Sequence, residues 1–277
     1  MANITAAEVN KLRKQTGAGM MDCKKALQEA EGDFEKAVEI LRKKGQKVAA
    51  KRADRETSEG YVIGKTSEDN SFGMAVMLSC ETDFVAKSDD FIKFVGQVAE
   101  TALQNKIKSL DDLKAYELNG RTIGEQVTDL MVKIGEKIEL AEYETIESAH
   151  VTAYNHMGNK LATLLGLNKA DIDGVDETGK ELAMQVAAMN PVAVDRDDVD
   201  PKIIEKEKEI GMEQARQEGK PENILEKIAM GKVNRFLKDN TLLNQDFVRD
   251  TKKSVKQYLS EKDKDLKVTG FKRVSLT

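Results

Sequence analysis

The chain has 277 residues, 40% of them hydrophobic and 34% charged, which is enough for about two domains with apolar cores. Its 44 basic and 49 acidic residues leave a net charge of −5, which gives no overall attraction to nucleic acid or anionic lipid. Two cysteines exclude a disulfide framework, no stretch approaches the roughly 18 apolar residues of a membrane span, and the start does not resemble a signal peptide, so we expect a cytoplasmic protein without a membrane partner.

Residues 5–44 have the pattern of three short helices. Thr5 is a suitable N-cap, and Glu8 follows at the capping-box spacing. Residues 17–19, Gly-Ala-Gly, end the first helix, a second spans 20–30, and a third follows Gly32-Asp33. These elements predict a small three-helix N-terminal domain.

A basic segment, residues 42–55, follows the predicted helices. It holds seven basic residues and a single acid, Asp54. RNA binding is one interpretation. A solvated tether is the simpler one and is favoured, because no aromatic residue is interleaved to stack on bases. Residues 1–55 are thus predicted to form the N-terminal domain and a basic linker.

From residue 60 onward one pattern appears twice: strand, turn, strand, helix. The elements fall at 60–63, 74–80 and 89–105 in the first copy, and at 151–154, 160–167 and 177–189 in the second. Between the copies lie a helix near 123–134 and a strand near 137–145. We predict an α+β fold whose two-part core has small antiparallel sheets with helices, the first half at 56–140 and the second at 141–199 plus 239–277.

A strand-to-helix corner in the first copy pairs an acid with an aromatic residue. It reads Thr82-Asp83-Phe84-Val85, and the second copy has Asn-Lys-Ala-Asp at 168–171 in its place. A residue that served only the scaffold would be expected in both copies. Partner binding is therefore the favoured role, although helix capping by Asp83 and core packing by Phe84 remain alternatives.

Residues 200–238 have a narrow apolar stripe between dense charges, interrupted by Gly219-Lys220-Pro221. This pattern is typical of an antiparallel helical hairpin, and such a thin hairpin should project from the body. A structural adaptor that dimerises through this hairpin is an alternative function. The following segment predicts a helix at 251–260 and a strand at 267–275.

Catalytic signatures are missing from the sequence. Gly17 and Gly19 lack the third glycine of a dinucleotide loop, and the two histidines, His150 and His156, have no cysteine near them in sequence. Cys23 and Cys80 fit small buried hydrophobic residues. We therefore expect a protein that is not an enzyme and needs no cofactor or metal.

Four segments together resemble one family, bacterial translation elongation factor Ts. They read, in chain order, LRKQTGAGMMDCKKAL at 12–27, ETDFVA at 81–86, GKPENI at 219–224 and LLNQDFV at 242–248. The resemblance implies a guanine nucleotide exchange factor that binds elongation factor Tu with GDP and promotes GDP release. It also implies a ubiquitin-associated-like N-terminal domain, a two-part core and a protruding coiled-coil hairpin, with no direct nucleic-acid contact.

The resemblance also implies roles for particular residues. Asp83 and Phe84, flanked by Thr82 and Val85, match the pair that enters the GTPase near its magnesium–nucleotide site. The matches to the positions that anchor the GTPase domain are Arg13, Met20 and Met21, and His156 matches a contact with another domain of the partner. Many members continue into a C-terminal helical module; because this chain stops at Thr277, we expect that contact to be absent.

Overall fold

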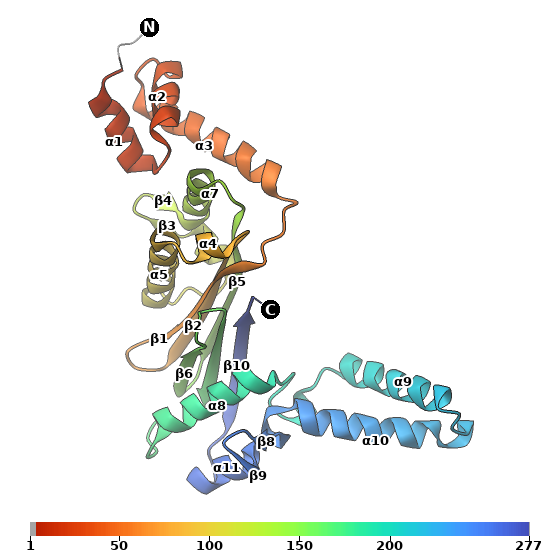
Figure 1. Cartoon of the computed structure of the whole chain (residues 1–277). Helices are drawn as coiled ribbons and strands as arrows, with labels where there is room; N and C mark the ends of the chain where they lie inside the picture. Colours follow the sequence, from red (N-terminus) through yellow and green to blue (C-terminus); the bar gives the residue numbers. More distant parts are fainter. Residues whose placement is uncertain (1–3, 277) are drawn as a thin grey trace.

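The computed structural model describes residues 4–276 as an elongated molecule, with the N-terminal helices at one end and a helix pair projecting sideways near the other (Figure 1). The described residues do not include 1–3 or Thr277. The expectation about a signal peptide drew on residues 1–3, and the expectation about a further helical module drew on Thr277. The architecture is mixed α+β with small antiparallel sheets, as the sequence predicts.

The N-terminal unit consists of α1 (Ala6–Thr16), α2 (Met20–Glu29) and α3 (Phe34–Arg52). The predicted capping box is present: Glu8 N–H donates to Thr5 Oγ1, and Thr5 N–H donates to the Glu8 carboxylate at 2.7 Å. Gly17 ends α1 with φ of 68°, a conformation that glycine adopts without strain. Leu12, Cys23 and Leu27 are fully buried between the helices and form the centre of this small core.

The basic segment is not a tether, because α3 continues through it to Arg52. Lysine, arginine and alanine favour a helix, and this propensity outweighs the charge density that suggested a linker. The helix also has a surface to dock on, since Gly45 lies against Thr128 of α7 (Ile123–Ile134). Five of the seven basic side chains form ion pairs: Arg42 with Glu125, Lys43 with Glu39, Lys44 with Asp22, and Arg52 and Arg55 with Glu81.

The first core half is built on a sheet of order β1-β2-β5, in which all pairs are antiparallel. Its strands are β1 (Glu59–Thr66), β2 (Phe72–Cys80) and β5 (Ile138–Glu147). The one-turn α4 (Asp83–Ala86) follows β2, and α5 (Asp89–Gln104) and α7 cover the sheet. Between them lie α6 (Leu110–Ala115) and the short strands β3 (Glu117–Leu118) and β4 (Arg121–Thr122).

The second half repeats this plan with order β10-β7-β6, so the predicted internal repeat is confirmed. Its elements are β6 (His150–Asn155), β7 (Leu161–Leu167), α8 (Val175–Met189) and β10 (Val268–Ser275). The third strand, β10, pairs with β7 as β5 pairs with β2. The two sheets pack on each other through Val62, Ala75, Leu164 and Val274.

The predicted helical hairpin is present as α9 (Pro201–Gln217) and α10 (Glu222–Asn240), and it projects from the second half (Figure 1). Gly211 allows the helices to approach closely, because a Cβ there would lie 3.1 Å from Ala229 Cα. At the base, Val199, Val233 and Leu237 form a small apolar cluster. The one-turn η1 (Arg196–Asp198) precedes α9.

The segment after the hairpin differs from prediction at one point. The helix expected over 251–260 begins later, as α11 (Val255–Lys262), because Asp250–Ser254 forms β9 and pairs with β8 (Asp246–Phe247). The turn η2 (Leu242–Asn244) leads into β8. Within residues 4–276, no helix is long and apolar enough to cross a membrane.

Candidate partner-binding site

The corner at 82–85 forms the start of α4. Thr82 has extended backbone angles and is the N-cap, with its Oγ1 accepting the Val85 N–H at 3.4 Å. Val85 packs against the first core, and Ala86 is buried. Because two of its side chains are fixed inward, the turn presents its other two, those of Asp83 and Phe84, to solvent.

Phe84 is 84% exposed although it is a large apolar side chain. The core positions nearby are filled instead by Phe91 and Phe94 of α5, which are 0% and 9% exposed. The interpretation of Phe84 as a core residue is therefore wrong. Because the Phe84 side chain is not buried within the chain, the free energy of burying it remains available for binding a partner.

Asp83 keeps a charged and accessible carboxylate. Lys87 Nζ donates to Asp83 Oδ2 at 2.7 Å, and this contact holds the pKa of the carboxyl below its ordinary value. Thr82 is the N-cap of α4 and Ser88 that of α5, so neither helix takes Asp83 as its cap residue. The carboxylate is paired with Lys87 and partly exposed, with 47% of the Asp83 side chain accessible to solvent.

Two glutamates that the sequence analysis did not single out support the corner. Glu136 Oε2 accepts the Thr82 N–H at 3.0 Å, and Glu136 Oε1 accepts the Thr82 hydroxyl at 2.7 Å. Glu81 Oε1 accepts the Lys137 N–H at 2.5 Å and also contacts Arg52 and Arg55. Glu81 adjoins the corner motif, but Glu136 lies 54 residues from Thr82 and no sequence signal joins them.

Met20 and Met21 begin α2 and are 52% and 62% exposed, and Arg13 in the last turn of α1 is also exposed. These three residues belong to α1 and α2 at one end of the molecule, whereas the corner begins α4 in the core (Figure 1). Exposed methionines suit a protein contact because their flexible, polarisable side chains adapt to a partner surface.

His156 lies in the turn between β6 and β7 and is exposed. Its Nδ1 is 3.0 Å from the Tyr154 hydroxyl, which orients the ring. Met157 follows it and is 90% exposed, although the sequence analysis did not select it. The sequence signal that could have identified Met157 is an apolar residue in a glycine-containing turn. Buried His150, the other histidine, contacts Asp176 instead.

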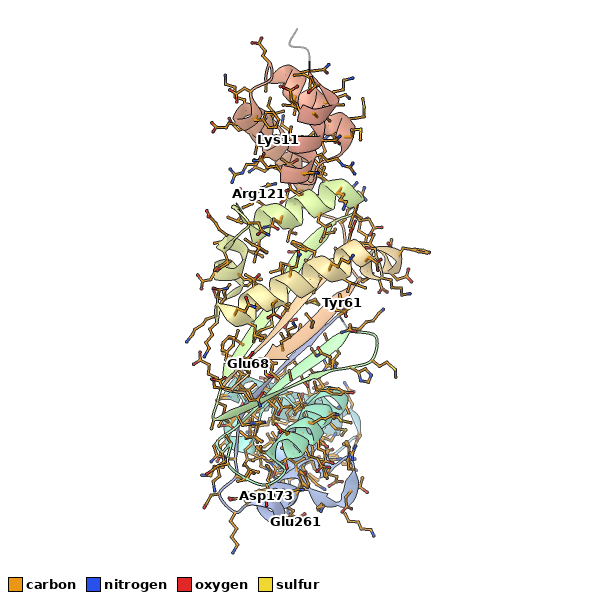
Figure 2. The ribbon with its side chains drawn as sticks, turned by 90° about the vertical axis from the view of Figure 1, so that its left-hand side faces the viewer. Lys11, Tyr61, Glu68, Arg121, Asp173 and Glu261 are labelled. Atoms are coloured by element: carbon orange, nitrogen blue, oxygen red, sulfur yellow. The ribbon has the colours of Figure 1, made fainter. Side chains whose placement is uncertain are left out.

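The N-terminal unit is docked on the core by charged side chains at the junction where Figure 2 labels Arg121. Arg121 pairs with Glu125 and Asp129 of α7, and Arg42 of α3 pairs with the same Glu125. Burial raises the pKa of the Asp129 carboxyl, with Arg121 opposing it. An open cleft of about 240 Å³ lies beside Arg121 and Asp129.

The site has the character of a protein-binding surface rather than a catalytic pocket. Among residues 4–276, no group of three or more His, Cys, Asp or Glu side chains could hold a metal ion. Cys80 is buried, and burial raises the pKa of its thiol to about 12, so it is a poor nucleophile. Exposed Phe84, Met20, Met21 and Met157 are typical of the class of factors that act by binding another protein.

Comparison with known proteins identifies the family within that class. A family model described as elongation factor Ts matches residues 81–277. The elongation factor Ts of Christiangramia forsetii is 55% identical over 276 residues, which cover 100% of both chains. Those of Cytophaga hutchinsonii and Flavobacterium psychrophilum are 51% and 50% identical, again over 100% of both chains. The chain therefore belongs to the elongation factor Ts family, nucleotide exchange factors for elongation factor Tu that are not enzymes.

Proposed function

We propose that this protein promotes GDP release from elongation factor Tu by inserting Phe84 and Asp83 near the magnesium–nucleotide site. The observation that carries the proposal is the 84% exposure of Phe84 on a turn whose next two side chains, Val85 and Ala86, pack against the core. A free-standing aromatic side chain on a short, capped turn has the shape of a wedge. Asp83 adds a negative charge where a metal and its ligands would lie.

The thermodynamics of exchange require binding that differs between partner states. Because coupling between two ligands is reciprocal, a factor that weakens GDP binding must itself be weakened by GDP. Burying Phe84 only in the nucleotide-free state would contribute about 1.5–3 kcal/mol, or roughly 10- to 150-fold in the coupling constant. The wedge supplies this difference between states, and other contacts must supply the anchoring.

The anchoring contacts in this proposal lie on separate parts of the molecule. Arg13, Met20 and Met21 bind the GTPase domain from the N-terminal unit, and His156 binds a second domain of the partner. We propose that the chain is divided into four units: the N-terminal unit with its linker (1–55), the first core half (56–140), the second core half (141–199 with 239–277) and the hairpin (200–238). Three clusters of buried residues support the separation of the N-terminal unit and the two core halves.

The test measures fluorescent GDP release from elongation factor Tu with wild-type protein and with Phe84→Ala. Because Phe84 is exposed, the variant should unfold at the same temperature as the wild type but stimulate release about 10-fold less or worse. Val192→Ala is the matched control, since Val192 is exposed and apolar but lies after α8 in the second half. Wild-type stimulation by Phe84→Ala at equal occupancy of the partner would refute the wedge.

The hairpin supports a second, self-association contact. Ile210 and Met230 are exposed on α9 and α10 although the two helices pack together, and Ile224 is exposed near the turn. We propose that a second copy of the chain covers these side chains. Equilibrium sedimentation tests this contact independently of exchange.

A further inference from the structure

The end of the β2–β5 ladder has an unusual closure. The last paired residues of these strands are Cys80 and Ile138. Beyond them, Glu81 Oε1 accepts the Lys137 N–H at 2.5 Å, while Glu136 Oε2 accepts the Thr82 N–H at 3.0 Å. Each carboxylate thus binds the backbone N–H that follows the other glutamate, and the pair continues the ladder with side-chain acceptors.

Comparison with the second core half shows which of these two bonds closes the sheet in both halves and which occurs only at the corner. There Asn168 follows β7 as Glu81 follows β2, and its Oδ1 accepts the Lys267 N–H at 2.7 Å. Closing the ladder from this position is therefore common to both halves. The residue that corresponds to Glu136 is Leu266, which is buried and apolar. The bond from Glu136 to the corner has no counterpart in the repeat.

Glu136 reaches the wedge through Thr82. Its Oε1 accepts the Thr82 hydroxyl at 2.7 Å, and that hydroxyl oxygen in turn accepts the Val85 N–H. The direction of this hydroxyl is therefore fixed by a charged acceptor, which strengthens the bond. The Glu136 carboxylate therefore fixes the first turn of α4, which carries Asp83 and Phe84.

The same closure joins the N-terminal unit to the corner. Arg52 and Arg55 contact the Glu81 carboxylate at 3.3 and 3.0 Å. Lys137 Nζ donates to the carbonyls of Ala53 and Arg55 at 2.8 and 2.9 Å. The Lys137 N–H, with the two arginines, holds the pKa of the Glu81 carboxyl below its ordinary value, so it is anionic at neutral pH. The end of α3 therefore lies on the ladder end that supports α4.

We infer that Glu136 is a positioning residue for nucleotide exchange: it holds α4 so that Phe84 meets the partner already oriented. The inference rests on the proposed wedge. A wedge on a loose turn would have to be ordered during binding, and that cost would subtract from the free energy available to weaken GDP. In this inference Glu136 acts through Thr82, to which it is hydrogen-bonded, and is not assigned a contact of its own with the partner.

The first experiment uses the free protein and measures hydrogen–deuterium exchange of the amides at residues 82–86. Glu136→Ala should accelerate exchange there while the amides of β1 and β2 stay protected, which also shows that the variant folds. Glu136→Gln should restore protection, because an amide oxygen can accept the Thr82 N–H and its NH₂ can donate to the hydroxyl. Glu147→Ala is the control, since Glu147 ends the same strand β5 and pairs with Lys108.

The second experiment measures GDP release in a double-mutant cycle of Glu136→Ala and Phe84→Ala. Glu136→Ala alone should slow stimulated release by about 10-fold, the value of a charged hydrogen-bond acceptor. In the Phe84→Ala background the same change should have little further effect, because the group that it positions is gone. A merely structural role would give additive losses.

The outcomes separate the two proposals. Unchanged amide exchange at 82–86 in Glu136→Ala, or additive losses in the cycle, overturns the positioning role while the wedge stands. Normal GDP release with Phe84→Ala alone overturns the wedge and the inference that rests on it.

Discussion

Replacing Gly45 with leucine should detach the N-terminal unit from the core without unfolding either. A Cβ at position 45 would lie 3.1 Å from Thr128 Cγ2 and 3.7 Å from Val132 Cγ2. Leucine extends three carbons beyond that Cβ into α7, an overpacking that costs about 1–3 kcal/mol. Removing a glycine from a helix interior stabilises α3 by about 1 kcal/mol. The substitution thus stabilises α3 itself but destabilises its packing on α7, so the contact between α3 and α7 should open.

The assay is a distance measurement between spin labels on Lys25→Cys of α2 and Asp111→Cys of α6, both exposed positions. Gly45→Leu should broaden the distance distribution and weaken binding to elongation factor Tu. Gly96→Leu is the matched control, since Gly96 lies inside α5 with open space where its Cβ would be. A Gly45→Leu distribution as narrow as that of the control would refute the docking argument.

Three further predictions follow from the exposed surfaces. Asp83→Asn should slow GDP release. Because Lys87 lowers the pKa of Asp83, the ratio of wild-type to variant rates should stay constant from pH 8 to about 5 and fall only as the carboxyl protonates below its ordinary pKa. A ratio that changes near pH 7 would contradict this. Met20→Ala with Met21→Ala should raise the Kd for elongation factor Tu, measured by titration calorimetry, and leave the unfolding temperature unchanged, whereas an unaltered Kd would exclude the anchoring role. Replacing residues 201–240 by a short loop should convert any dimer to monomer in equilibrium sedimentation, and a monomeric wild type would rule out the hairpin contact.

The sequence predicts most of the elements because their signals are local. The capping box at Thr5 and Glu8, the glycine at 17 and the Gly-Lys-Pro turn each fix the chain over a few residues, and all appear where predicted. The repeat also survives, since alternating apolar residues mark the same strands in both halves. The exposure of Phe84 was one of two alternatives, and its missing counterpart in the second half favoured the correct one.

Features that depend on distant partners could not be predicted. The segment after residue 42 looks like a linker because its charges have no visible partners, yet Arg42 meets Glu125 and Arg52 meets Glu81 only after folding. Glu136 similarly has no local pattern that marks it as a support for Thr82. The strand β9 displaces the start of α11 because it pairs with β8, and two-residue strands leave almost no periodic signal.

The pairing of β10 with β7 has a consequence for how the chain folds during synthesis. Leu165 pairs with Phe271, so the second sheet gains its third strand only after the ribosome has made about a hundred more residues, including the whole hairpin. The first sheet has all of its strands once residue 147 has emerged. Domains generally fold as units during translation, N-terminal first, and long-range strand pairing is slow. The half that carries the wedge should therefore reach its native state while the other still exposes the unpaired edge of β7 to chaperones.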